Sequence, residues 1–360
     1  MRPRNNRSRG SFLSAVIAAT TMLLALPALG GRLLLLPPAP IPERNPQTPD
    51  KIELGKTLFF DRRLSGDGTM SCATCHIPDQ AYADGQELSL SYPTTRNWRN
   101  TPTLINVAYY KTLFLDGRAE NLEEQALFPV MSPFEMNLNL DFLEEKLRVV
   151  PEYEAAFRKV FGGKITRERI AMAIAAFERT LVSVNAPLDR YLAGDNAVLS
   201  EAARKGYAVF AGKGKCADCH FGANLADDRF HALNVPENPE HQADPRITAT
   251  RRFVAKISGF GDYRNLSEDP GRHLVTGDGK DRKAFRTPTL REIAKTAPYM
   301  HNGGLKSLEE VIEFFARGGG PGNAALTPLA LTAEEKIALK AFLVEALSGE
   351  ELPLKYPKVP

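Results

Sequence analysis

The sequence contains Cys72-Ala73-Thr74-Cys75-His76 and, much further along, Cys216-Ala217-Asp218-Cys219-His220. These two Cys-x-x-Cys-His pentads use all four cysteines of the chain. The pattern is typical of a covalently attached c-type haem, in which two thioethers hold the porphyrin and the adjacent histidine supplies an imidazole to the iron. A pair of disulfides and a four-cysteine zinc site are the alternatives. Zinc would leave both histidines unexplained, and the two cysteine pairs lie much further apart than in compact zinc modules.

The pentads therefore predict two haem c groups. We expect one to be attached through Cys72 and Cys75 and the other through Cys216 and Cys219. The axial iron ligands are then His76 and His220.

An export signal is expected at the N-terminus. Arginines precede an apolar run over residues 12–26, and small residues follow up to Gly31. We expect residues 1–31 to be a cleaved signal peptide and the mature protein to reside in the periplasm, where c-type haems are attached. An uncleaved anchor is the alternative, because residues 33–36 extend the apolar run. That run is shorter than the roughly 20 residues of a membrane-spanning helix, so no stable membrane insertion is expected.

The charge of the chain excludes one class of partner. The sequence has 46 basic and 43 acidic residues, and four of the basic residues lie in the expected signal peptide. The remaining chain is close to neutral, so we expect no nucleic-acid partner.

A short repeat indicates two related units. Residues 55–59 and 206–210 both follow a Gly-x-x-apolar-Phe pattern, and each precedes one pentad. In cytochrome c domains a glycine at this place lets the helix cross closely against the terminal helix. Ile170, Ile174, Phe177 and Leu181 have the helical spacing expected of such a terminal helix. In the second unit, Thr332 and Glu335 resemble a capping box that opens a helix with Ile337, Ala341 and Phe342 on its core face.

These signals predict an all-α fold of two tandem cytochrome-c-like domains, each with one covalently bound haem. We expect a proline-rich extended connector over 32–49, an N-terminal haem domain over 50–186, a C-terminal haem domain over 187–347 and a tail over 348–360. Ser200 is the expected N-cap of the first helix of the second domain. Residues 262–281 are rich in glycine and charge and are expected to form a loop.

The segments after each pentad carry further motifs. The first domain contains Arg99-Asn100-Thr101-Pro102-Thr103-Leu104-Ile105-Asn106, Phe114-Leu115-Asp116-Gly117-Arg118 and Pro133-Phe134-Glu135-Met136. The second contains Phe285-Arg286-Thr287-Pro288-Thr289-Leu290 and Thr296-Ala297-Pro298-Tyr299-Met300-His301. With these motifs the chain resembles, from Glu53 to Leu347, the bacterial di-haem cytochrome c peroxidases. It resembles equally well the related MauG-type enzymes, which oxidise tryptophans in a partner protein.

The resemblance implies a division of labour between the haems. The first haem would be peroxidatic, with Glu135 as the distal acid-base group and Gln125 beside it. A surface glutamate at a helix start is the alternative for Glu135. The second haem would accept electrons from outside and relay them. The resemblance also implies Ca²⁺ between the domains, with Asn100 as a side-chain ligand and Thr296 and Pro298 as carbonyl donors.

Three positions depart from the family pattern. Tyr92 stands where the peroxidases have a histidine that closes the oxidised first haem, so we expect an open first haem without reductive activation. Leu115 stands where both groups have a tryptophan between the haems. The alternative electron routes are then tunnelling past Leu115 or a path by way of Tyr109, Tyr110 or Trp98. Phe315 stands where the sixth ligand of the second haem is expected. The second iron is then five-coordinate, or its sixth ligand is a water or another side chain, with Met300, His231 and His273 as the candidates. His301 is expected near the second haem without binding the iron.

The leading functional hypothesis is a periplasmic di-haem peroxidase that reduces hydrogen peroxide to water with electrons from a small c-type cytochrome or a cupredoxin. The alternative is a MauG-like oxidase that oxidises side chains of a protein partner. A pure electron-transfer cytochrome is a third reading, and it would make the Glu135 and Gln125 matches accidental. The family often forms dimers, so a homodimer is one option.

Overall fold

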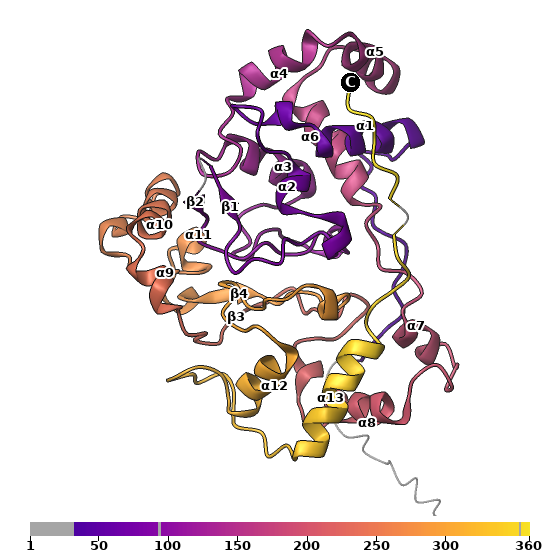
Figure 1. Ribbon diagram of the computed structural model, residues 1–360, viewed down its shortest axis with the longest axis vertical. Helices are drawn as coiled ribbons and strands as arrows, with labels where there is room; N and C mark the ends of the chain where they lie inside the picture. Colours follow the sequence, from indigo (N-terminus) through magenta and orange to yellow (C-terminus); the bar gives the residue numbers. More distant parts are fainter. Residues whose placement is uncertain (1–31, 93–94, 353) are drawn as a thin grey trace, which may run out of the picture.

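The computed structural model describes residues 32–92, 95–352 and 354–360, so the expected signal peptide lies outside the described residues. The chain is rich in helix (Figure 1). The helices are α1 Pro49–Phe60, α2 Cys72–Cys75, α3 Leu122–Met131, α4 Leu140–Arg148, α5 Pro151–Phe161, α6 Arg167–Glu178, α7 Pro187–Leu192, α8 Glu201–Ala211, α9 Pro239–Ala243, α10 Pro245–Ile257, α11 His273–Thr276, α12 Leu308–Ala316 and α13 Ala333–Glu345. None of the described helices is long and apolar enough to cross a membrane.

The strands are few and short. β1 Leu90–Ser91 pairs antiparallel with β2 Thr95–Arg96, and β3 Phe230–Ala232 pairs antiparallel with β4 Ala284–Arg286. The second pair joins the segment after the second pentad to one of the family motifs, with His231 opposite Phe285. The sheets therefore serve to tie loops together, while the helices form the cores.

The first unit, α1 to α6, is built on a close crossing of α1 and α6. The side chain of Thr48 caps α1 by accepting a hydrogen bond from the backbone N of Lys51 (3.3 Å). A Cβ atom on Gly55 would lie 1.8 Å from the carbonyl oxygen of Ala173 on α6, so only glycine permits this approach. Leu58 and Phe59 of α1 are fully buried, each in a different core cluster of the first unit.

The second unit, α7 to α13, repeats this crossing with α8 and α13. A Cβ atom on Gly206 would lie 1.9 Å from the carbonyl oxygen of Ala338. The predicted caps are present, because Ser200 accepts a hydrogen bond from Ala203 N (3.0 Å) and Thr332 forms a capping box with Glu335.

One predicted core position of α13 is wrong. Ile337 is 69% exposed, and the buried face of α13 consists of Ala338, Leu339, Phe342 and Leu343. The contact between Gly206 and Ala338 sets which face of α13 meets α8, and it turns Ile337 towards solvent.

The segments at both ends of the described chain run from one unit to the other. Leu33 is buried in the core of the second unit and pairs with Gly222, whereas Asn45 is fully buried against α3 and α6 of the first unit. The predicted connector is thus extended but docked. The tail after α13 returns to the first unit (Figure 1), where Tyr356 packs edge-on against Phe60 with ring centroids 5.4 Å apart.

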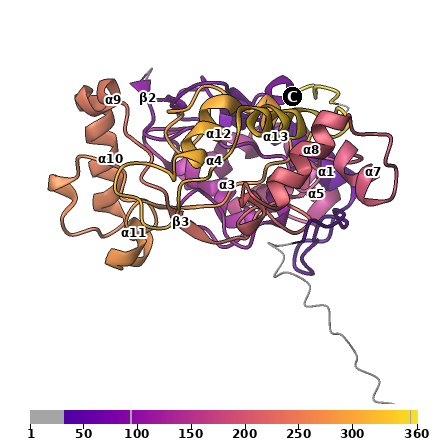
Figure 2. The same ribbon diagram turned by 90° about the horizontal axis from the view of Figure 1, so that it is seen from below.

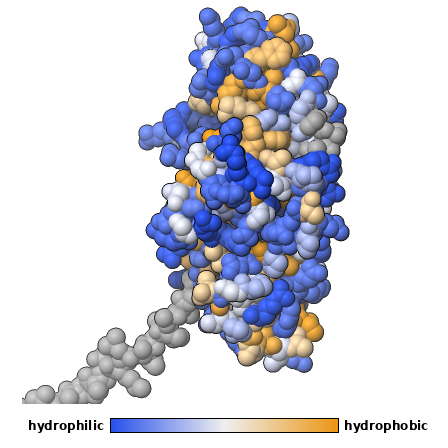
Figure 3. All heavy atoms as spheres, turned by 90° about the vertical axis from the view of Figure 1, so that its left-hand side faces the viewer, coloured by the Kyte–Doolittle hydropathy of each residue, from blue (hydrophilic) through white to orange (hydrophobic). Residues whose placement is uncertain are grey.

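A helical lobe stands at one edge of the molecule. Figures 1 and 2 place α9, α10 and α11 together there, next to β2. This lobe includes much of the predicted loop at 262–281, in which α11 and short turns are the regular structure. Figure 3 shows that the face on this side is mostly hydrophilic, with scattered hydrophobic patches.

Candidate functional site

The first pentad follows α1 and forms α2, which ends at Cys75. The ring atom Nδ1 of His76 lies 3.0 Å from the carbonyl oxygen of Tyr82. A carbonyl can only accept, so Nδ1 donates and the lone pair of Nε2 is left for a metal. Burial lowers the pKa of His76, which favours the neutral ring that binds iron.

The second pentad has the same arrangement in a different turn. Nδ1 of His220 lies 2.9 Å from the carbonyl oxygen of Leu225, and burial lowers the pKa of His220 as well. In both pentads, therefore, a backbone carbonyl orients the histidine and fixes its tautomer.

The two pentads open onto one connected cavity with a volume of about 940 Å³. All four cysteines line it and none forms a disulfide. Burial raises the pKa of Cys75 to about 12 and that of Cys219 to about 11, so both sulphurs are protonated thiols in the protein without a bound group. A pair of cysteine sulphurs on the cavity wall and an adjacent imidazole oriented by a backbone carbonyl fit a c-type haem at each pentad.

Glu135 and Gln125 lie on the wall of this cavity. Gln125 is on α3, and Glu135 follows the end of α3. The side-chain amide of Asn97 donates a hydrogen bond to Oε1 of Glu135 (3.4 Å). After burial, the charge of Glu135 is the largest contribution that raises the pKa of Cys75, so this carboxylate lies close to the first pentad.

Tyr92 lies beside the backbone that carries Glu135. Its backbone N donates to the carbonyl oxygen of Phe134 (2.9 Å), and its ring packs against the core that contains Met70 and Met136. Tyr92 therefore anchors the Glu135 loop through the backbone.

Helix α10 of the second unit closes the other side of this pocket, which the sequence reasoning missed. Phe253 packs edge-on against Phe134, with ring centroids 5.2 Å apart, and Val254 and Ile257 line the cavity. Asp244 followed by Pro245 is the N-cap and first-turn pattern that could have revealed this helix.

The three aromatic candidates for an electron route have different surroundings. Trp98 is buried under the guanidinium of Arg99, 4.0 Å from its ring centroid, and the hydroxyl of Tyr109 donates to the carbonyl oxygen of Pro37 (2.6 Å). Trp98 and Tyr110 both contact the second unit. Trp98 packs in a buried cluster with Ile247 and Leu274, whereas the hydroxyl of Tyr110 accepts a hydrogen bond from the backbone N of Thr289 (2.5 Å).

Tyr110 also lies next to the position that lacks tryptophan. The guanidinium of Arg286 stacks on the Tyr110 ring at 3.4 Å, and the backbone N of Arg286 donates to the carbonyl oxygen of Leu115 (2.8 Å). Leu115 lines the cavity between the pentads.

A buried ionic cluster also joins the units here. The guanidinium of Arg99 binds Asp116 of the first unit (2.6 Å) and Asp269 of the second (2.7 Å). Arg118 forms a further ion pair with Asp116 (2.8 Å). Burial alone would raise the pKa of Asp116, but Arg118 and Arg99 outweigh it and lower that pKa to about 2.

On the side of α12 and α13, the wall of the cavity near the second pentad is apolar. Phe315 on α12 lines it together with Leu308, Ile312, Leu339 and Leu343. Met300 also lines the cavity, whereas His273 is buried elsewhere with Nδ1 against the carbonyl oxygen of Asp278 (2.7 Å).

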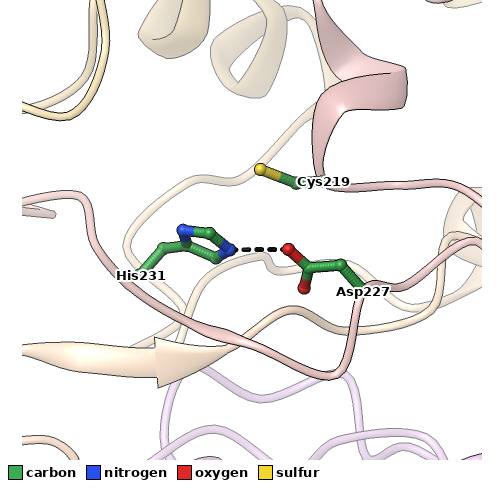
Figure 4. Close-up of side chains that lie close together, drawn as sticks. All are labelled: Cys219, Asp227 and His231. Carbon is green, nitrogen blue, oxygen red and sulfur yellow. Dashed lines mark hydrogen bonds and ion pairs between the residues drawn. The ribbon is translucent and has the colours of Figure 1, made fainter. Parts of the chain in front are cut away.

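Two further histidines have defined surroundings. Nε2 of His231 is hydrogen-bonded to a carboxylate oxygen of Asp227 (2.8 Å) beside the sulphur of Cys219 (Figure 4). Cys219 belongs to the second pentad, so His231 lies at the attachment sulphur. His301 stacks on Phe285 with ring centroids 3.9 Å apart, and burial lowers its pKa to about 4.

The three residues expected to bind Ca²⁺ all line the cavity. Nδ2 of Asn100 donates to the carbonyl oxygen of Gln86 (2.7 Å), and Gln86 and Pro298 also line a smaller neighbouring pocket. In the described part of the chain, the hydrogen bonds leave the carbonyl oxygens of Thr296 and Pro298 free.

Comparisons with known proteins agree with this arrangement. Residues 49–197 match the family described as di-haem cytochrome c peroxidase. The chain is 45% identical over 335 residues to the cytochrome-c peroxidase IdrP1 of Denitromonas iodatirespirans, covering 90% of this chain and 89% of the relative. It is 36% identical to the methylamine utilization protein MauG of Methylorubrum extorquens, covering 93% of this chain and 88% of the relative.

A solved structure extends the likeness to the fold. The crystal structure of a MauG-like protein associated with microbial copper homeostasis has a TM-score of 0.75 at 29% identity, covering 91% of this chain and 95% of that chain. The sequence relatives share about nine-tenths of their length with the chain, and they include both peroxidases and MauG proteins. The chain therefore belongs to the di-haem cytochrome c peroxidase family, and it is an oxidoreductase that acts on peroxide.

Proposed function

We propose that the chain reduces hydrogen peroxide to water at the first pentad, with electrons that enter through the second pentad from a small c-type cytochrome or a cupredoxin. The observation that supports this most is the asymmetry of the cavity. The wall near the first pentad carries Glu135 and Gln125, whereas the wall near the second is apolar around Phe315.

The two units would be cytochrome-c-like domains, with boundaries at 50–186 and 187–347. Their close helix crossings at Gly55 and Gly206, each followed by one pentad, support this division. In each domain the cysteine pair would hold a haem and the following histidine would bind its iron. The haem supplies the redox-active iron at which peroxide is bound and reduced.

Side chains of the protein would transfer the protons of hydrogen peroxide. Glu135 takes a proton from one oxygen of hydrogen peroxide and returns it to the other, which then leaves as water. The amide of Asn97 orients the carboxylate, and the amide of Gln125 can donate to a peroxide oxygen. Val254 and Ile257 of α10, which line the cavity, would restrict the entry of water and of large peroxides.

The first site would accept peroxide without prior reduction. Tyr92 replaces the expected gating histidine, and it is held through its backbone N and by its packing against the core. A phenol in this position has no imidazole to offer the iron. Electrons would cross between the haems past Leu115, by way of Tyr110 and its hydrogen bond to Thr289.

A Ca²⁺ ion would join the two domains. Its donors would be the side chain of Asn100 and the free carbonyl oxygens of Thr296 and Pro298, and oxygen donors of this kind suit the ion. Equilibrium dialysis tests the assignment: Asn100→Ala loses bound Ca²⁺, and Asn265→Ala, at an exposed asparagine of the second unit, keeps it. Retention of Ca²⁺ by Asn100→Ala contradicts it.

A MauG-like oxidase is the second candidate. Tyr92 and Phe315 favour it, because neither the gating histidine nor the expected methionine ligand is present. We propose the periplasm as the location of the protein for either function, on the basis of the expected signal peptide, and a homodimer is one option for its assembly.

Turnover with reduced cytochrome c distinguishes the functions. The holoprotein is mixed with hydrogen peroxide and reduced cytochrome c, and oxidation of the cytochrome is followed. The peroxidase predicts many turnovers, which Glu135→Gln abolishes and the exposed-site control Glu120→Gln retains. A long-lived oxidised species without cytochrome turnover supports the protein oxidase. Full activity of Glu135→Gln would falsify the role of this carboxylate.

A further inference from the structure

Glu178 is a buried carboxylic acid to which the proposed function assigns no role at either haem site. It is the last residue of α6 and only 4% exposed. Its atom Oε2 has no hydrogen-bond partner, and its side chain lines the cavity that contains the first pentad. Such an unpaired group is costly to bury as an ion.

The neighbouring charges do not neutralise Glu178. Arg179 turns away and forms a two-bond ion pair with Glu123 on α3, with both N–O distances 2.9 Å. On α1, Lys51 donates to the side chain of Asn45 (2.9 Å) and to a backbone carbonyl. Burial and then the charge of Glu178 raise the pKa of the Cys72 thiol, and in the holoprotein this sulphur would be a thioether without a proton.

The ionisation of Glu178 is therefore governed by the cavity. Burial raises the pKa of Glu178 to about 8, and the charge of Glu123 adds to this rise whereas Arg179 opposes it. The contribution to the pKa of Cys72 means that Glu178 lies on the side of the first cysteine of the pentad. A group in this position responds to any change of charge at the first pentad, because charges interact strongly in a poorly solvated cavity.

We propose that Glu178 binds a proton when the first haem takes up an electron and releases that proton when the haem is oxidised. The proposal rests on the proposed attachment of haem at Cys72 and Cys75. The electron comes from the cytochrome or cupredoxin donor and goes to the iron. The proton comes from solvent and forms an O–H bond on the carboxylate, so the added negative and positive charges cancel.

This role differs from the role proposed for Glu135. Reduction of one hydrogen peroxide to two waters consumes two electrons and two protons. Glu135 moves a proton between the two peroxide oxygens and takes up none overall, whereas Glu178 brings in a proton together with an electron. The two carboxyl groups therefore have different roles in one cavity: Glu135 transfers a proton within the substrate, and Glu178 takes up a proton from solvent.

A redox titration of the holoprotein at several pH values tests the proposal. The midpoint potential of the first haem is expected to fall as the pH rises, by up to about 59 mV per pH unit, which is tenfold in the reduction equilibrium. In Glu178→Gln this slope is expected to vanish. Glu168→Gln removes an exposed carboxylate from the same helix and is expected to keep the slope.

A second readout does not depend on potentials. The reduced-minus-oxidised infrared difference spectrum is expected to show the C=O band of a protonated carboxyl group, and Glu178→Gln is expected to lack that band. An unchanged slope or an unchanged band in Glu178→Gln overturns the proposal, as does a pH-independent potential in the wild type. The pyridine haemochrome assay of each variant checks haem attachment separately, so a failure of the proposed function is recognised as such.

Discussion

Replacing Gly206 by alanine adds a methyl group where α8 touches α13. The new Cβ atom would lie 1.9 Å from the carbonyl oxygen of Ala338 and 2.7 Å from Cβ of Phe342. Backbone and core atoms cannot rotate away as a surface side chain can, so the helices must separate. Overpacking of this kind costs about 3 kcal/mol, and the better helix propensity of alanine returns about 1 kcal/mol. The net loss of stability is about 2 kcal/mol.

Thermal unfolding of the holoprotein measures this loss. A loss of about 2 kcal/mol lowers the melting temperature by about 4–8 °C for a cooperative unit of 150–250 residues. The matched control is Gly261→Ala, because a Cβ atom at Gly261 meets nothing within 4 Å. The same substitution at Gly55, where the Cβ atom would lie 1.8 Å from Ala173, should destabilise the first unit similarly. If Gly206→Ala has the same melting temperature as Gly261→Ala and the wild type, the close helix crossing is refuted.

Three further substitutions test the region between the haems. Asp116→Asn leaves Arg99 and Arg118 without their shared partner and should destabilise the protein in urea at neutral pH by about 3 kcal/mol, as expected for a broken buried pair. The pKa of Asp116 is lowered to about 2, so its stabilisation is complete above its unfolded pKa near 4 and is lost as the pH falls towards 2. The difference between wild type and Asp116→Asn should therefore shrink over that range, and a constant difference contradicts the assignment. Tyr110→Phe should slow electron arrival at the first haem in stopped-flow experiments, whereas Tyr109→Phe, whose hydroxyl contacts only the carbonyl of Pro37, should not. Equal rates for both would exclude Tyr110 from the route. Phe315→Met should convert the second haem to a six-coordinate low-spin species in EPR spectra, and an unchanged spectrum would show that Phe315 does not face the iron.

The features of the fold that were predicted correctly have local signals. Ser200 and the pair Thr332 and Glu335 cap helices within a single turn, so their spacing alone reveals them. Gly206 was recognised by its place before the pentad, and the structure explains it by the contact with Ala338. Ile337 was placed on the wrong face because periodicity does not state which of two adjacent stripes meets the neighbouring helix.

The features that were missed depend on contacts between distant segments. Phe253 reaches Phe134 across more than a hundred residues, and no local pattern announces that contact. The docking of Tyr356 on Phe60 is of the same kind. Glu178 belongs to no motif of the sequence, and its burial and its unpaired Oε2 are what distinguish it.

The central proposal is that peroxide reacts at the first pentad, with Glu135 as proton carrier and with no histidine to close the iron. The most direct measurement is a stopped-flow experiment in which the fully oxidised holoprotein meets one equivalent of hydrogen peroxide without any prior reduction. We expect an immediate spectral change that Glu135→Gln slows strongly and Glu120→Gln does not. An oxidised first haem that is six-coordinate and low-spin, and that stays inert to peroxide until it is reduced, would contradict it.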